Sequence, residues 1–413
     1  MPATALRRAP GRDAIEPART GGLVDYARLV FAGGDLLPAW NALMARATAV
    51  DGDPGAMLDL STLLQLTGQR EQGLALQTDA LASQRHYRRV LGTGEGPRLL
   101  ALAAAGDMMA STPVEFLLAG WNGVLDLLFL APGDAPLTEM PDHDLAILAV
   151  GESDANAPIL AALRETLAGW PRPMLNASPD AIVALGRDRA PDRLAGRKGL
   201  DAPPTRRVGR AELADLAAGR RDLAELLPGR GFPIIVRPID SHAGSGLKKL
   251  DRPEDLAGYL AARPEPAFYV APFVDYSGPD GRFRKLRVAL VDGRPYIAHL
   301  AISDHWMVHY LNAGMAAAEA EAKRAEEAAM MAAFDEDFAL RHAEAFQALH
   351  QAFGLDYFAV DCAEDRQGRL LIFEADTAMI VHDMDPPELY PYKAPAMRKL
   401  FAAFQALIAA RAG

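Results

Sequence analysis

Three carboxylates near the end of the chain could hold a metal ion. Asp361 and Glu374 fall on neighbouring strands of a predicted hairpin, and Asp376 follows Glu374 by two residues. Side chains two apart on a strand share a face, so we expect the three carboxylates to converge. Converging carboxylates repel one another unless a cation joins them, and ligands that are all oxygen are typical of Mg²⁺. The spacing predicts a magnesium site.

A cation and a loop of small residues come earlier in the chain. The apolar segment from Phe232 to Val236 ends in Arg237-Pro238, and a small-residue loop follows at once. A fixed positive charge beside the backbone N–H groups of such a loop suits the oxygens of a polyphosphate. We therefore expect phosphate contacts from Arg237 and from the loop residues Ser241, His242, Gly244, Ser245 and Gly246.

Between these two features lies a hinge-like strand, from Tyr269 to Asp275. Its backbone is expected to hydrogen-bond the edge of an adenine ring, with apolar side chains flanking the ring. Asp275, at the end of this strand, is then placed for a ribose hydroxyl. Together with the phosphate loop and the magnesium site, this strand predicts a bound nucleotide.

Two histidine-containing segments flank these motifs. His305 lies in SDHWMVHY and His382 lies in VHDMDP. Both are expected near the reaction centre, where they would contact the acceptor substrate or polarise its amine, and we assign Lys285 and Ser303 to the same substrate region. The alternative is that His382 caps a loop and His305 fills a gap in the core.

The elements that position these residues occupy the second half of the chain. Strands rich in Val, Ile, Tyr and Phe alternate with polar turns, and Asp292-Gly293 between two alternating runs is a strong hairpin signal. An Ala/Glu-rich stretch, 315–333, and an amphipathic stretch, 337–353, separate the two predicted hairpins. Residues 204–413 therefore read as an α+β domain.

The first half of the chain divides into three parts. Residues 1–22 lack an apolar pattern and are expected to be a loose tail. Residues 23–92 have helical periodicity and include a stretch like one tetratricopeptide repeat, which serves either as a helical cap on the next domain or as a docking module. Any helical hairpin with a glycine turn would give the same pattern. Residues 97–203 alternate strands and helices and predict a small α/β unit.

The order of these motifs resembles the ATP-grasp superfamily from about 178 to 407, with the preceding α/β unit similar to the domain that this family places before its nucleotide-binding half. The nearest resemblance is to the glutathione synthetase and ribosomal-protein glutamate ligase branch. That branch joins a carboxylate to an amine through an acyl phosphate. The resemblance implies an α+β ATP-grasp fold that uses ATP and Mg²⁺.

The resemblance also implies roles for individual residues. Arg237 would bind the α- and β-phosphates, the 241–246 loop would cover the γ-phosphate, and Arg287 would stabilise the transferred phosphoryl group or the acyl phosphate. Val270, Ala271 and Phe273 would surround adenine, and Asp361, Glu374 and Asp376 would bind magnesium. Either Arg187 or Arg189 would replace an earlier phosphate-binding lysine.

The chain departs from the family pattern at three positions. Arg237 stands where lysine is usual, and its guanidinium can still bind phosphate. Asp376 stands where asparagine is usual, which adds charge to the metal site. The acidic hinge residue common in the family is missing near Ala271, which weakens the adenine assignment.

Composition limits the classes of partner. The 413 residues include 54 acidic and 43 basic side chains, a formal charge of -11, which disfavours nucleic acid and anionic membranes. Cys362 is the single cysteine, so no internal disulfide can form, and a cytoplasmic protein is expected. Strand alternation places Cys362 in the core. A homodimer is left open.

The predicted function is an ATP-dependent ligase that forms an amide or peptide bond between a carboxylate substrate and an amine acceptor, either a small molecule or a peptide. One rival is a small-molecule kinase that uses the same ATP site. Another is a non-catalytic nucleotide-binding scaffold whose helical segment docks a partner. Amine-dependent release of ADP separates the ligase from the kinase.

Overall fold

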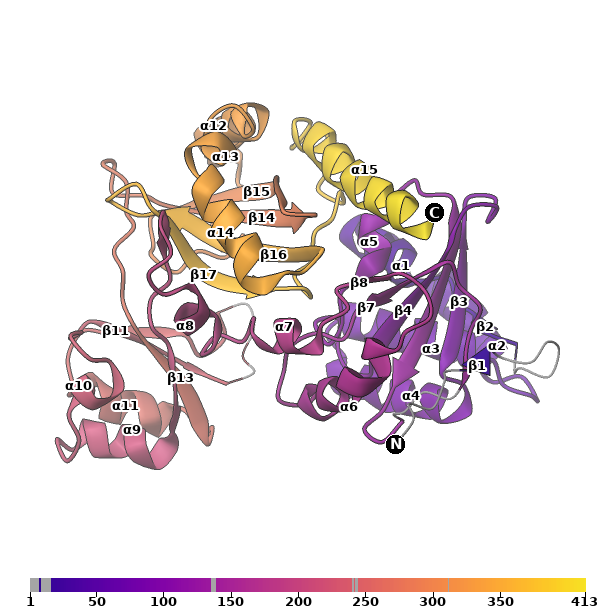
Figure 1. Cartoon of the computed structure of the whole chain (residues 1–413), viewed down its shortest axis with the longest axis horizontal. Helices are drawn as coiled ribbons and strands as arrows, with labels where there is room; N and C mark the ends of the chain where they lie inside the picture. The colour runs from indigo at the N-terminus through magenta and orange to yellow at the C-terminus, as the bar shows by residue number, and fades with distance from the viewer. Residues whose placement is uncertain (1–6, 9–15, 135–138, 240, 242–243, 311) are drawn as a thin grey trace.

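The computed structural model describes residues 7–8, 16–134, 139–239, 241, 244–310 and 312–413. Figure 1 shows the N-terminal part to the right and the second half of the chain, with its two sheets, to the left. The structure confirms the predicted α+β class. Within the described ranges, no helix combines the length and the apolar character needed to cross a membrane.

The predicted helical segment contains two pairs of helices. They are α1 Leu23–Phe31, α2 Leu37–Ala47, α3 Pro54–Leu66 and α4 Arg70–Ser83. The turn between α3 and α4 contains Gly68, whose φ is 84°. Gly73 allows the two helices to approach closely, because a Cβ there would lie 2.8 Å from the carbonyl oxygen of Ser61.

The predicted loose tail is wrong at its C-terminal end. Ala18–Arg19 form β2, which pairs with β3, His86–Leu91, inside the segment predicted to be helical. The buried carboxylate of Asp59 accepts hydrogen bonds from the N–H groups of Gly21 at 2.8 Å and Gly22 at 3.3 Å. Residues 18–22 are thus fixed to the domain by contacts that a local apolar pattern does not reveal.

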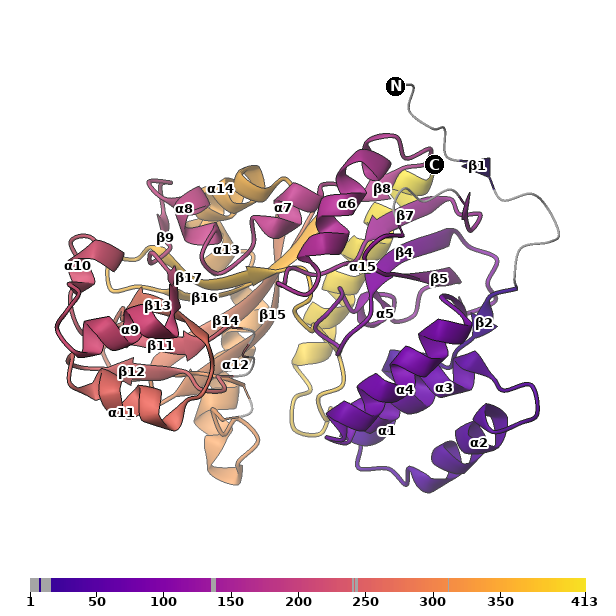
Figure 2. The same cartoon turned by 90° about the horizontal axis from the view of Figure 1, so that it is seen from below.

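The N-terminal sheet has the strand order β2-β3-β5-β4-β7-β8. Its further strands are β4 Arg98–Ala104, β5 Gly123–Leu130, β7 Leu145–Leu148 and β8 Met174–Leu175. The strands from β5 to β8 are parallel, as the α/β pattern predicts, whereas β3 runs antiparallel to β5. Its helices are α5 Val114–Leu117, α6 Ala157–Ala168 and α7 Pro179–Val183. Helix α8, Ala190–Leu194, instead contacts α14, Ala343–Phe353, in the other half of the molecule (Figure 2). At one edge of this domain, β1 Arg7–Arg8 pairs with β6 Glu139–Met140.

The small sheet is antiparallel, with the order β10-β13-β11-β12. Its strands are β10 Arg206–Gly209, β11 Ile234–Pro238, β12 Lys248–Leu250 and β13 Ala267–Pro272. It is packed with α9 Arg210–Ala217, α10 Leu223–Leu226 and α11 Asp255–Ala262, at the lower left of Figure 1.

The large sheet has the order β15-β14-β16-β17-β9. Its strands are β9 Leu200–Asp201, β14 Phe283–Val291, β15 Arg294–Ser303, β16 Tyr357–Glu364 and β17 Leu370–Asp376. The predicted hairpin turn joins β14 to β15, and both Asp292 and Gly293 have positive φ, as a type I′ turn requires. Its helices are α12 Glu321–Ala333, preceded by a 3₁₀ turn Ala318–Ala320, then α13 Phe338–Arg341 and α14 Ala343–Phe353.

The C-terminal helix α15, Lys393–Ala412, packs against β14 and β15 of the large sheet and against α5 and β7 of the N-terminal domain. One continuous cluster of buried apolar side chains includes strands of the N-terminal sheet and of the large sheet, together with α15. Figures 1 and 2 show this helix running between the two halves of the molecule. Cys362 is fully buried, as strand alternation predicts.

Candidate functional site

A cavity of about 420 Å³ lies between the small sheet and the large sheet. β11 and β13 supply one wall, and β14, β16 and β17 supply the other. Among the predicted residues, its lining includes Arg187, Arg237, Gly244, Ala271, Phe273, Lys285, Arg287, Asp361 and Glu374. The structure therefore brings together side chains that are up to 187 positions apart in the sequence.

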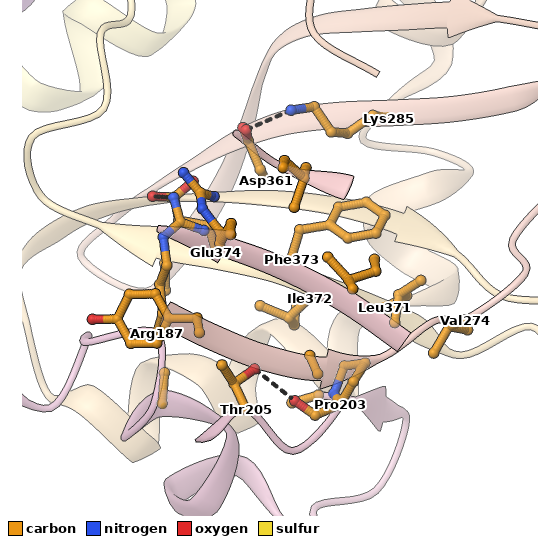
Figure 3. Close-up of a pocket in the computed structure, with 18 of the residues that line it drawn as sticks. Arg187, Pro203, Thr205, Val274, Lys285, Asp361, Leu371, Ile372, Phe373 and Glu374 are labelled. Carbon is orange, nitrogen blue, oxygen red and sulfur yellow. Dashed lines mark hydrogen bonds and ion pairs between the residues drawn. The ribbon is translucent and has the colours of Figure 1, made fainter. Parts of the chain in front are cut away.

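Asp361 is held by two cations at the charged end of this cavity. It faces Arg287 across the ladder between β14 and β16, and the Arg287 Nε donates to its carboxylate at 2.8 Å. The Lys285 Nζ donates to the same carboxylate at 2.8 Å (Figure 3). Burial alone would raise the pKa of Asp361, but the two cations outweigh it and hold that pKa well below its usual range. Asp361 is therefore an anion near neutral pH.

Glu374 faces Asp361 across the ladder between β16 and β17. The guanidinium of Arg187 points toward Glu374 in Figure 3 and donates a hydrogen bond to its carboxylate. Burial acts to raise the pKa of Glu374, but the charges of Arg187 and Arg237 lower it overall. Glu374 is thus an anion paired with a cation that was predicted to bind phosphate.

Asp376 has the opposite electrostatic balance. Burial, followed by the charge of Glu374, raises the pKa of Asp376 to about 7. The N–H of Ala378 donates to Asp376 at 2.9 Å, and this bond only partly offsets the increase. The surroundings of Asp376 therefore favour either a proton or an additional cation.

Arg237 lies at the end of β11, as the strand pattern predicts. Its Nε donates to the Ser241 hydroxyl at 3.1 Å, and a second N–H donates to the Ser241 carbonyl. Burial, followed by the nearby charge of Arg187, lowers the pKa of Arg237 to about 10. Two half-buried guanidinium groups that repel each other favour an anion between them, so this part of the cavity suits phosphate.

The other end of the cavity is apolar. Figure 3 shows Pro203, Val274, Leu371 and Phe373 away from the charged pair of Arg187 and Glu374. An apolar wall at one end and clustered cations at the other match a ligand with a flat ring and an anionic tail. A nucleotide has this distribution of polarity.

An aromatic segment closes the side of this apolar end. The ring of Trp306 stands edge-on to the ring of Phe273, with centroids 5.7 Å apart. The backbone carbonyl of Trp306 accepts a hydrogen bond from the Tyr276 hydroxyl at 2.5 Å. Tyr276 also packs against Phe373, with ring centroids 4.9 Å apart. These contacts fix the segment that follows β15 against the cavity.

Three predicted nucleotide contacts lie elsewhere. Arg189 pairs with Glu152 at 2.9 Å, so the structure places Arg187, rather than Arg189, at the charged end. Val270 is fully buried in the apolar core between the small sheet and its helices, and β13 is paired on both sides at this residue. Asp275 pairs with Arg366 at 2.8 Å on the surface.

The remaining predicted residues are spread around the cavity. Ser303 is buried and accepts from the N–H of His305, whose side chain is exposed. The carbonyl of Gly246 accepts from the Tyr259 hydroxyl at 2.8 Å, and Ser245 is an exposed turn residue. His242 lies outside the described residues. His382 lines a second cavity.

Sequence reasoning missed several residues of the site. Tyr269 lines the cavity, and burial raises its pKa to about 12. Glu152, four residues after the end of β7, contributes negative charge near Asp376. Thr205 lines the apolar end together with Pro203. The position of Glu152 just beyond a buried parallel strand is the one available sequence signal for it.

The donor chemistry of the three carboxylates fits Mg²⁺, because every donor is oxygen and Asp376 favours an added cation. Across the described part of the chain, no group of three or more His, Cys, Asp or Glu side chains is gathered closely enough to hold a metal ion. Arg287 and Lys285 pair with the carboxylate of Asp361, and Arg187 pairs with that of Glu374. An anion that binds Arg187 would release the carboxylate of Glu374, and Glu374 and Asp376 would then be available to Mg²⁺.

Comparisons with known proteins give structural similarity only. No protein-family model and no curated protein matches the sequence. An ATP-grasp RimK domain protein from Sphaerobacter thermophilus is 17% identical, with a TM-score of 0.40 over 75% of this chain and 97% of its own. The D-alanine-D-alanine ligase from Coxiella burnetii is 9% identical, with a TM-score of 0.46 over 77% and 96%. The VanG D-Ala:D-Ser ligase from Enterococcus faecalis is 11% identical, with a TM-score of 0.44 over 75% and 100%.

Proposed function

We propose that the protein is an ATP- and Mg²⁺-dependent ligase that joins a carboxylate to an amine, in the manner of the glutathione synthetase and ribosomal-protein glutamate ligase branch of the ATP-grasp superfamily. The observation that carries this proposal is the polarity of the cavity. An apolar wall around Phe373 and Val274 continues into a charged end with Arg187, Arg237, Arg287 and Asp361.

In this proposal the nucleotide base lies against the apolar wall, and the phosphates extend toward the arginines. Arg187 and Arg237 bind phosphate oxygens, and the half-buried setting of both strengthens these charge-assisted bonds. Magnesium would be held by Glu374 and Asp376 with Asp361 beside them, and when bound it would neutralise charge on the transferred phosphoryl group. Arg187 would exchange Glu374 for phosphate, which frees Glu374 for the ion.

The reaction has two steps. The substrate carboxylate attacks the γ-phosphorus, and the bond to the β-phosphate oxygen breaks to release ADP and leave an acyl phosphate. An amine then attacks the acyl carbon and expels phosphate, which forms the amide. Arg287, held by Asp361 and by the carbonyl of Ile380 at 2.9 Å, is positioned to stabilise the negative charge that moves in both steps.

A melting experiment tests the nucleotide site first. ATP with Mg²⁺ should raise the melting temperature because it binds only the folded state, and EDTA should remove the part of the increase that depends on the metal. Carboxylates and amines are then screened in pairs for ADP release, with the product identified by mass. ADP release that needs the carboxylate but no amine would show a kinase. No effect of ATP and Mg²⁺ on melting would reject the nucleotide site.

A further inference from the structure

A second cavity, of about 590 Å³, lies between the helical segment and the chain that leads into α15. Helix α1 lines it with Arg28 and Phe31, and the segment after β17 lines it with His382, Asp385 and Glu388. Figure 2 shows α1 beside the yellow segment that precedes α15. The helical segment therefore forms one wall of a cavity and does more than cover the N-terminal sheet.

Most charges in this second cavity are already paired. Arg28 pairs with Asp383 at 2.5 Å, which closes one edge between α1 and the facing segment. Lys393, itself buried, pairs with Asp385 at 2.8 Å and with the fully buried Glu327 at 3.3 Å. One lysine thus meets two carboxylates, which leaves an excess of negative charge at this end.

Glu388 adds a further negative charge. Its side chain is exposed, and among the residues that the structure describes it has neither an ion pair nor a hydrogen bond. Glu388 and the Lys393 group together give the second cavity a net negative charge. A cationic ligand would meet a favourable potential there.

An apolar surface faces these carboxylates. Phe31 is 53% exposed although it is aromatic, and its ring lies 5.4 Å from the ring of His382. Met384, Pro386 and Met397 continue the apolar lining. The cavity therefore combines an apolar wall with an acidic end, which matches an ammonium group carried on an apolar chain.

His382 fits the same ligand class without adding charge. The N–H of Met384 donates to its Nδ1 at 3.1 Å, so the ring proton is on Nε2. Burial, the largest effect, lowers the pKa of His382 against the opposing charge of Asp385. The imidazole is therefore neutral near neutral pH and does not repel an incoming cation.

The two cavities share one segment of chain as a partition. Met379 and Ile380 line the first cavity, and His382 lines the second. The carbonyl of Ile380 accepts from Arg287, the residue expected at the acyl phosphate, at 2.9 Å. The segment that holds Arg287 therefore lies between a ligand in the second cavity and the reaction centre.

We infer that the second cavity binds the amine acceptor, and that the acceptor is a primary amine on an apolar chain. This inference rests on the proposed function. The amine enters as an ammonium ion and its nitrogen attacks the acyl carbon, so that a C–N bond forms and the C–O bond to phosphate breaks. The ammonium nitrogen loses two protons as it becomes the amide nitrogen. One proton leaves on the departing phosphate, and the other goes to solvent.

Binding of hexylamine, measured by saturation-transfer NMR, tests the amine site, with hexanoate as a probe of the same length and opposite charge. Hexylamine should bind saturably and more tightly than hexanoate. Glu388→Gln should weaken hexylamine binding roughly fivefold by removing the unpaired carboxylate. Phe31→Ala should weaken it roughly threefold or more by removing apolar contact. Glu71→Gln, an exposed acidic residue on α4, is the matched control and should leave binding unchanged.

The inference is overturned if hexylamine does not bind saturably, if hexanoate binds as tightly, or if neither variant weakens binding. The melting shift of the parent protein with ATP and Mg²⁺ is measured separately. Amine binding that responds to both variants, with no ATP shift, would reject the proposed function and retain a cavity that binds amines. An ATP shift together with amine binding that ignores both variants would reject the amine site alone.

Discussion

The carboxylates at the charged end of the first cavity differ in the cations that pair with them. Asp361 has two cations, whereas Glu374 has Arg187, a residue that phosphate would also attract. The pair of Arg187 and Glu374 is therefore the part of the site that ligand binding is expected to rearrange. Asp361 is expected to stay with Arg287, because its two oxygens are both engaged.

Glu374→Gln keeps the size of the side chain and removes its charge. We expect the part of the ATP melting shift that depends on Mg²⁺ to shrink, while the shift with ATP and EDTA persists, because Arg187 stays available for phosphate. Turnover of an identified substrate pair should fall roughly a hundredfold or more. Glu319→Gln, on the exposed turn before α12, serves as control. Parent-like turnover would show that Glu374 is not a metal ligand.

Asp376→Asn should change how stability depends on pH in the absence of metal. The folded state raises the pKa of Asp376 to about 7, so its stabilising effect is complete below the unfolded pKa and is lost as pH rises through about 7. Asparagine has no proton to lose. The free energy of unfolding of the variant, relative to the parent, should therefore increase between about pH 4 and about pH 8 in EDTA. A difference that stays constant across this range would contradict the raised pKa.

At the scale of the elements, Asp59 on α3 joins the helical segment to the strand that precedes it. Asp59→Ala removes the acceptor for the N–H groups of Gly21 and Gly22 and for the Tyr26 hydroxyl. Each buried donor left without a partner costs about 1–3 kcal/mol, so the free energy of unfolding should fall by at least about 2 kcal/mol in urea titrations. Asp79→Ala, exposed on α4, should change it by less than about 0.5 kcal/mol. Equal effects of both substitutions would show that residues 18–22 are not held by Asp59.

Elements with local signals could be predicted from the sequence. The Asp292-Gly293 turn needs only two residues with positive φ, and the α3–α4 hairpin follows from helical periodicity around Gly68. β2 was missed because its pairing with β3 depends on residues about 70 positions away, and two residues carry no periodicity. β3 was missed because it was read as part of the helical segment, although its exposed and buried residues alternate.

The site was predictable where register decides the geometry. Asp361 and Glu374 face each other because they lie on paired strands, and strand alternation was enough to see this. The choice between Arg187 and Arg189 depends on how the segment between α7 and α8 packs against β17, which spacing does not give. Asp275 was misplaced because its partner, Arg366, lies on a turn whose position depends on the tertiary fold.

At the scale of the whole molecule, the second half of the chain does not stand as a separate body. The apolar cluster that contains Leu286 and Val360 of the large sheet also contains Leu100 and Ile147 of the N-terminal sheet. Helix α15 contributes Phe404, which is fully buried and packs against Tyr357 with ring centroids 5.3 Å apart. Loss of packing at α15 should therefore lower the stability of both the N-terminal domain and the second half of the chain.

Phe404→Ala tests this coupling. Removing the buried ring should lower stability by about 3–5 kcal/mol, and because the core is shared we expect both halves to lose stability together. Trp306 reports on the second half, and Trp40, Trp121 and Trp170 report on the first. Urea unfolding followed by fluorescence in Phe404→Ala, with and without an added Trp306→Phe substitution, should therefore give coincident midpoints. If Phe404→Ala lowers the urea midpoint in the protein that keeps Trp306 but not in the protein that carries Trp306→Phe, then α15 stabilises the second half alone. The two halves would then unfold independently.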